Sequence, residues 1–123
     1  MLKIRLYSVI AVAHKDCNIV AEFIINKDDD IFKGHFPGQP VLPGACMLQI
    51  LKEMTEAALN KKIRLKKADQ MKFLALIDPS VNNTLKLDIS YVLTEDDFKI
   101  NAVMSSQSGP CFKFRGSFIV LKP

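Results

Sequence analysis

The sequence predicts an α+β fold in which an antiparallel sheet wraps around one long central helix. Residues 44–60 are the one long helical segment, and nearly every residue of its first half is apolar. Strand-like stretches lie on both sides of it, two before the helix and about four after. This order places the helix against one face of a sheet whose strands are joined by turns. The length of 123 residues fits a single domain, residues 1–123.

The region before the helix predicts two strands and a short helical turn. Residues 2–13 are apolar with three polar residues interposed, which is typical of a strand with one solvent-exposed face. Residues 14–16 predict a turn, and 17–26 a second strand. An acidic run follows at 28–30, where Asp side chains can accept the free N–H groups of a helical turn.

The segment 34–44 predicts a loop. It contains three prolines and three glycines in eleven residues, which excludes both a helix and a paired strand. Prolines fix backbone angles, so this loop is stiff. A long, stiff loop is typical of a functional segment.

The helix predicted for 44–60 is buried at its start and amphipathic later. From Ala45 to Leu51 only Gln49 is polar, whereas Glu53 belongs to a more polar second half. Residues 60–62, Asn-Lys-Lys, suit a helix end because cations favour the C-terminus of a helix. The remaining chain predicts strands within 63–77 (two short runs), 85–91, 98–104 and 112–121.

Composition excludes several functional classes. The net charge of +4 and pI near 9.0 are only mildly basic, and without Trp or a basic stripe with exposed aromatics we expect no nucleic-acid partner. We expect no membrane span and no signal peptide. Cys17, Cys46 and Cys111 show neither disulfide-framework nor zinc spacing, which favours a reducing, cytoplasmic setting without metal.

The decapeptide His-Phe-Pro-Gly-Gln-Pro-Val-Leu-Pro-Gly at residues 35–44 leads directly into the predicted helix. It resembles the H-F-P-G-x-P-x-x-P-G signature of the β-hydroxyacyl-[acyl carrier protein] dehydratases, and every fixed position matches. The order of predicted elements agrees, so the resemblance covers essentially the whole chain. It implies a hot-dog fold, a homodimer or an assembly of dimers, and no cofactor. It also implies an acyl carrier protein or coenzyme A thioester as substrate, and a place in fatty-acid or polyketide-type synthesis.

Residue roles follow from that resemblance. His35 matches the catalytic histidine, and an imidazole suits proton transfer near neutral pH. Gly44 matches the glycine whose N–H binds the thioester oxygen, at a helix start where such groups are free. Substrate-binding positions are Phe36, Gly38, Pro43, Ala45, Phe73 and Leu74. Core packing explains Phe73 and Leu74 equally well.

The chain departs from the family pattern on the helix. The dehydratases carry Glu or Asp fourteen residues after the histidine, where this chain has Gln49, and those with Glu usually carry Gln four residues later, where it has Glu53. Glutamine cannot protonate a leaving hydroxide but can hold a hydroxyl by hydrogen bonds. Three outcomes stay open: His35 performs both proton transfers while Gln49 positions the hydroxyl, Glu53 acts directly or through water, or elimination is lost.

These outcomes correspond to three function classes. The first is a lyase that dehydrates 3-hydroxyacyl thioesters. The second is an acyl thioesterase that uses Glu53, and the third is a non-catalytic acyl-binding subunit partnered with a catalytic homologue. Cys46 is interpreted as a small core hydrophobe rather than a nucleophile. A basic cluster is either a solvated face or a docking rim for an acidic carrier: Lys61, Lys62, Arg64, Lys66 and Lys67.

Overall fold

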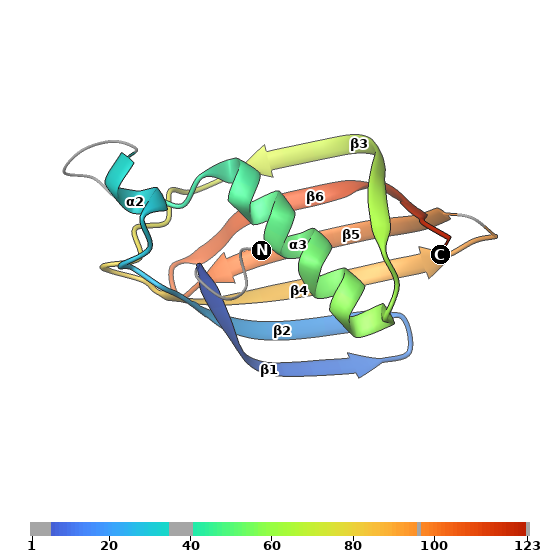
Figure 1. Ribbon diagram of the computed structural model, residues 1–123, viewed down its shortest axis with the longest axis horizontal. Coiled ribbons are helices and arrows are strands. Elements are labelled where there is room, and N and C mark those ends of the chain that lie inside the picture. The colour runs from blue at the N-terminus through green and yellow to red at the C-terminus, as the bar shows by residue number, and fades with distance from the viewer. Residues whose placement is uncertain (1–5, 35–40, 96, 123) are drawn as a thin grey trace.

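The computed structural model describes residues 6–34, 41–95 and 97–122 (Figure 1). These residues form a six-stranded antiparallel sheet in the order β1-β2-β4-β5-β6-β3, with the long helix α3 lying across one face. The predicted sheet around one central helix is therefore confirmed. The elements are β1 (Tyr7–Lys15), β2 (Asn18–Ile25), α2 (Ile31–Gly34), α3 (Gly44–Leu59), β3 (Ile63–Phe73), β4 (Thr84–Leu93), β5 (Asp97–Ser106) and β6 (Gly109–Val120).

The core lies between α3 and the concave face of the sheet. Strand β4 shows how the sequence builds it, because Leu85, Leu87 and Ile89 are buried while the residues between them are exposed. On the helix, Ile50 and Leu51 are fully buried against this face. Each such side chain contributes about 1.5–3 kcal/mol of transfer free energy, so the helix is held mainly by its apolar stripe.

Backbone geometry defines both ends of α3. Pro43 precedes the helix with φ −63° and ψ 145°, an extended conformation that proline favours. Asn60 follows it in the left-handed conformation, with φ 54° and ψ 45°, which asparagine tolerates better than most residues. The stop predicted at 60–62 is thus confirmed, although the left-handed Asn60 rather than a cation forms the cap.

Two predictions about individual segments are wrong. Residues 63–77 contain one long strand, β3, rather than two short ones. Bulges between Leu65 and Lys67 and between Ala68 and Gln70 interrupt the two-residue alternation, which hides a continuous strand from pattern analysis. His14 lies within β1 rather than in a turn, and its Nε2 is 2.8 Å from the Tyr91 hydroxyl.

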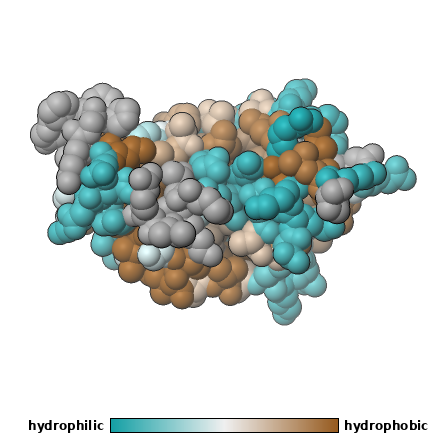
Figure 2. All heavy atoms as spheres, viewed as in Figure 1, coloured by the Kyte–Doolittle hydropathy of each residue, from teal (hydrophilic) through white to brown (hydrophobic). Residues whose placement is uncertain are grey.

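The two edge strands differ from the rest of the sheet in their exposure. All of β3 beyond Ile63 is exposed except half-buried Gln70, and most of β1 is exposed as well. Figure 2 shows hydrophobic surface along the lower edge, where Figure 1 places β1. No helix in the described part of the chain is long and apolar enough to cross a bilayer.

Candidate functional site

The start of α3 presents free backbone donors. The Pro43 carbonyl accepts hydrogen bonds from the N–H groups of Cys46 (3.0 Å) and Met47 (3.3 Å), which close the first turn. Within the described residues, the N–H groups of Gly44 and Ala45 have no acceptor. Unpaired N–H groups at a helix N-terminus, together with the helix dipole, favour the binding of a ligand oxygen that carries partial negative charge. Ala45 is exposed and Gly44 half-buried, so a ligand can approach these donors.

Phe73, at the end of β3, lies directly against Gly44. A Cβ on Gly44 would lie 2.6 Å from Cε1 of Phe73, so any other residue at position 44 would displace the Phe73 ring. The Phe73 ring stacks on Phe112, with ring centroids 5.2 Å apart, yet 53 % of Phe73 is exposed. Leu74 is 48 % exposed. Phe73 therefore packs on the core through Phe112 while about half of its own surface, and about half of that of Leu74, stays exposed.

About two and a half turns into the helix, the buried carboxylate of Glu53 connects α3 to β1. The Tyr7 hydroxyl donates to Glu53 Oε1 at 2.9 Å, and Gln49 Nε2 donates to Glu53 Oε2 at 2.9 Å. Tyr7 is 2 % exposed and Glu53 7 %, so of the two interpretations of Glu53, a solvated residue or a structurally hydrogen-bonded one, the structure shows the second. Buried polar groups need partners, and here each carboxylate oxygen has one.

Tyr7 is a site residue that sequence reasoning missed. The sequence places Tyr7 only in a predicted strand, and no sequence signal links it to Glu53, 46 residues later. Burial, followed by the hydrogen bond to Glu53 and its negative charge, raises the pKa of Tyr7 well above its ordinary value. Tyr7 therefore stays a neutral phenol that donates its proton to the carboxylate throughout the physiological range.

We expect Tyr7→Phe to lower the free energy of unfolding by about 1–3 kcal/mol, because it removes a donor from a buried carboxylate. Urea unfolding monitored by circular dichroism measures the change. Tyr91→Phe is the matched control, since the Tyr91 hydroxyl bonds at an exposed position and its loss should cost less. Equal costs for the two variants would contradict the structural importance of the Tyr7–Glu53 bond.

Glu53 also borders a small apolar pocket of about 210 Å³ between β1 and the second half of α3. Apart from Tyr7 and Glu53, its lining is Val9, Val12, Met54, Ala57 and Ala58. Glu53 therefore both lines this apolar space and accepts a hydrogen bond from Gln49.

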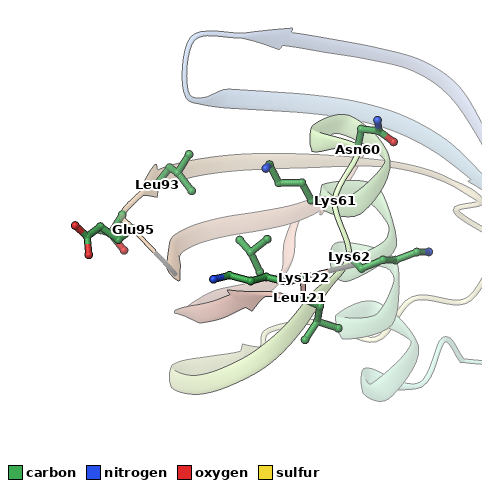
Figure 3. A pocket seen from close by; sticks show the side chains of 9 residues that line it. Asn60, Lys61, Lys62, Leu93, Glu95, Leu121 and Lys122 are labelled. Atoms are coloured by element: carbon green, nitrogen blue, oxygen red, sulfur yellow. The ribbon is translucent and has the colours of Figure 1, made fainter.

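The basic cluster lies away from the start of α3. Lys61 and Lys62 follow the C-terminal end of the 16-residue helix, which spans about 24 Å from Gly44. With Lys122 they line an open groove of about 790 Å³ near Leu93 and Leu121 (Figure 3). Within one chain the cluster therefore does not surround the free amides. Lys66 also forms an ion pair with Asp97 at 2.8 Å.

The remaining predicted residues fall into two groups. Cys46 is buried, and burial, with the negative charge of Asp29, raises the pKa of its thiol, which supports its interpretation as a core residue. His35, Phe36 and Gly38 lie outside the described residues. Pro43, Gly44, Ala45, Phe73 and Leu74 are brought to one end of α3, with Gln49 and Glu53 further along it.

Among solved structures, the dehydratase heterocomplex ApeI:P from Xenorhabdus doucetiae is similar with a TM-score of 0.74. Its identity is 18 %, covering 91 % of this chain and 96 % of that one. A hypothetical thioesterase with coenzyme A from Streptococcus pneumoniae is similar with a TM-score of 0.65 and 10 % identity, covering 94 % and 85 % of the two chains. At these identities the similarities establish a shared fold, which both dehydratases and thioesterases use.

Comparison of the sequence with known proteins identifies the family. Two relatives are the 3-hydroxyacyl-[acyl-carrier-protein] dehydratases FabZ of Oenococcus oeni (29 % identical, 64 % of this chain) and Clostridium acetobutylicum (28 %, 67 %). The chain spans 60 % and 62 % of the lengths of these two relatives. Residues 11–109 match the ApeI-like family, described as ApeI dehydratase. Because this match extends over most of the sequence, the chain belongs to the ApeI-like dehydratase family.

Proposed function

We propose that the protein removes water reversibly from a 3-hydroxyacyl thioester carried by an acyl carrier protein or coenzyme A. The observation that carries this proposal is the pair of free amides at Gly44 and Ala45, directly after the signature loop and beside exposed Phe73. A thioester oxygen bound there would be stabilised as negative charge develops on it. The exposed apolar surface of Phe73 and Leu74 would contact the acyl chain.

One histidine can perform both proton transfers of the proposed reaction. His35 takes the proton from C2, and the charge that develops on the thioester oxygen is held by the Gly44 N–H. The C3–O bond then breaks, the C2–C3 double bond forms, and His35 returns its proton to the departing hydroxyl to give water. Gln49 holds that hydroxyl by a hydrogen bond, since an amide cannot supply the proton.

The test is to incubate the purified protein with a 3-hydroxyacyl thioester and, separately, with the matching 2-enoyl thioester. Interconversion of the two supports the dehydratase. Release of free thiol would instead support a thioesterase, and a bound chain without turnover would support a non-catalytic acyl-binding subunit.

The two alternatives differ in how well the geometry favours them. Both oxygens of Glu53 accept hydrogen bonds from buried or half-buried partners, which argues against Glu53 as the base of a thioesterase. Similarity to a solved structure supports a paired subunit, because ApeI:P from Xenorhabdus doucetiae is a dehydratase heterocomplex. Against it stands the match of the whole signature loop, His35 included.

We further propose that the chain pairs with a second copy through the free edge of β3. The strand register places Leu65, Ala68 and Met71 opposite buried residues of β6, on the concave side of the sheet. Leu65 and Met71 are nevertheless 37 % and 39 % exposed, so this apolar side of β3 is partly exposed to solvent. A two-fold pairing centred on Ala68 would set Leu65 against Met71 of the second copy. It would also set Lys67 against Asp69, so the edge is self-complementary in charge.

Antiparallel pairing of this kind would also relocate the basic cluster. The first residues of β3 in one copy would run beside the last residues of β3 in the other. Arg64 of the second copy would therefore approach Phe73, and with it Gly44, so the cluster could flank the site that it does not reach within one chain. A basic rim there would speed the docking of an acidic carrier protein.

We expect Met71→Lys to shift the protein from dimer to monomer, because pairing would then bury a charge without a partner. Sedimentation velocity across a range of concentrations measures this. Met71→Leu is the matched control and should remain dimeric. If Met71→Lys sediments as the wild type does, the pairing edge is not β3.

A further inference from the structure

The hydrogen bonds around Glu53 restrict how the Gln49 amide can point. The Gln49 NH₂ group donates to Glu53 Oε2 at 2.9 Å, so this end of the amide points toward the carboxyl group of Glu53. The neutral Tyr7 phenol donates to the other carboxylate oxygen from the opposite side. Both partners of Glu53 are thus donors, and a reversed Gln49 amide would set its oxygen against the oxygen of Glu53 in place of this hydrogen bond.

The consequence is that the Gln49 carbonyl oxygen is the part of this side chain left to meet a ligand. Gln49 is half-buried, and no described residue donates to its oxygen. Gln49 lies five residues after Gly44, about 7.5 Å further along the helix axis. If the thioester oxygen of an acyl chain accepts from the Gly44 N–H, the substituent at C3 of that chain would lie at a comparable distance along the helix, close to Gln49.

We propose that Tyr7 and Glu53 are positioning residues that hold the Gln49 amide in one orientation, so that the site meets C3 of a bound acyl chain with a hydrogen-bond acceptor. This inference rests on the proposed acyl-thioester site. It predicts that the site prefers one substituent at C3 of the acyl chain over another. A 3-hydroxyl group can donate to the Gln49 oxygen, whereas a 3-oxo group can only accept and would leave two acceptors facing each other.

Binding of three stable ligands tests the preference. These are pantetheine amides of one chain length, in which an amide replaces the thioester, with a 3-hydroxyl group, a 3-oxo group or no substituent at C3. We expect the wild type to bind the 3-hydroxyl ligand about tenfold more tightly than the 3-oxo ligand, the difference of roughly one well-placed hydrogen bond. Isothermal titration calorimetry measures both affinities.

Glu53→Gln is the decisive variant. It conserves the side-chain volume and can still accept from Tyr7, but its own NH₂ group now needs an acceptor, which the Gln49 oxygen supplies by turning over. The tenfold preference should then fall to about twofold or reverse. Glu56→Gln is the matched control on the same helix. Glu56 Oε2 accepts from the Ile63 N–H at 2.9 Å, which a glutamine oxygen also does, so the preference should persist.

The three ligands separate failure of this inference from failure of the proposed function. Binding of all three ligands with equal affinity, or a preference that Glu53→Gln leaves intact, would overturn the positioning role while the acyl site stands. No binding of any ligand, the unsubstituted one included, would overturn the acyl site itself. A second measurement is independent of ligands: the side-chain NH₂ resonances of Gln49 should lose their hydrogen-bonded shift in Glu53→Leu but keep it in Glu56→Gln.

Discussion

The double variant Gln49→Glu/Glu53→Gln should dehydrate a 3-hydroxyacyl thioester about 10²–10⁴ times faster than the wild type, the usual contribution of a general acid. The exchange puts a carboxyl group at the helix position where the dehydratases carry their acid. The two side chains already touch at 2.9 Å, and residues four apart share one helix face, so their hydrogen bond can re-form with the roles reversed. Tyr7 would still have an oxygen to donate to at position 53. Initial rates measured at several pH values would also reveal the new titrating group.

Each single exchange serves as a control for the double variant. Gln49→Glu alone places two carboxyl groups side by side and removes the amide donor from buried Glu53, so like-charge repulsion and a lost hydrogen bond destabilise the protein. Its gain in rate should therefore be accompanied by a loss of stability that the double variant avoids. Glu53→Gln alone brings no acid to position 49 and should not accelerate the reaction. A double variant no faster than the wild type would show that position 49 does not contact the departing hydroxyl.

His35→Ala should lower the dehydration rate by at least about 10²-fold, because the proposed mechanism assigns both proton transfers to this one imidazole. Binding of the unsubstituted pantetheine amide should change little, since the free amides of α3 and the Phe73 surface remain. Steady-state kinetics should thus show a fall in kcat with a nearly constant KM.

His14→Ala is the matched control for His35→Ala. The chain has only these two histidines, and His14 bonds the Tyr91 hydroxyl at an exposed position of β1. Its replacement should leave kcat unchanged. Equal effects of the two substitutions, or none from His35→Ala, would contradict the assignment of the base.

Local sequence patterns predicted much of the fold because the signals are short-range. The helix expected at 44–60 is observed as Gly44–Leu59, and its end coincides with Asn60 in the left-handed conformation. The alternation expected at 85–91 lies within β4. Strand β3 was predicted less well, since its two bulges change the side-chain period that pattern analysis relies on.

The position of Glu53 illustrates what such patterns miss. From sequence it belongs to the polar half of an amphipathic helix, next to Lys52 and near Glu56. In the structure it is buried, because Tyr7 supplies a hydrogen bond from another part of the chain. A partner 46 residues away cannot be found from helical periodicity, which describes only neighbours along the helix.

The sequence by itself determined the sheet around a central helix and the place of the signature loop before that helix. Both depend on residues that are close together along the chain: prolines and glycines that exclude helix, and apolar side chains at regular spacing. Only the tertiary structure decided that Phe73 lies against Gly44, that Lys61 and Lys62 lie at the far end of α3, and that Tyr7 and Gln49 both donate to Glu53. These contacts join segments distant in sequence, and they arise from how the strands pack on the helix rather than from any local preference.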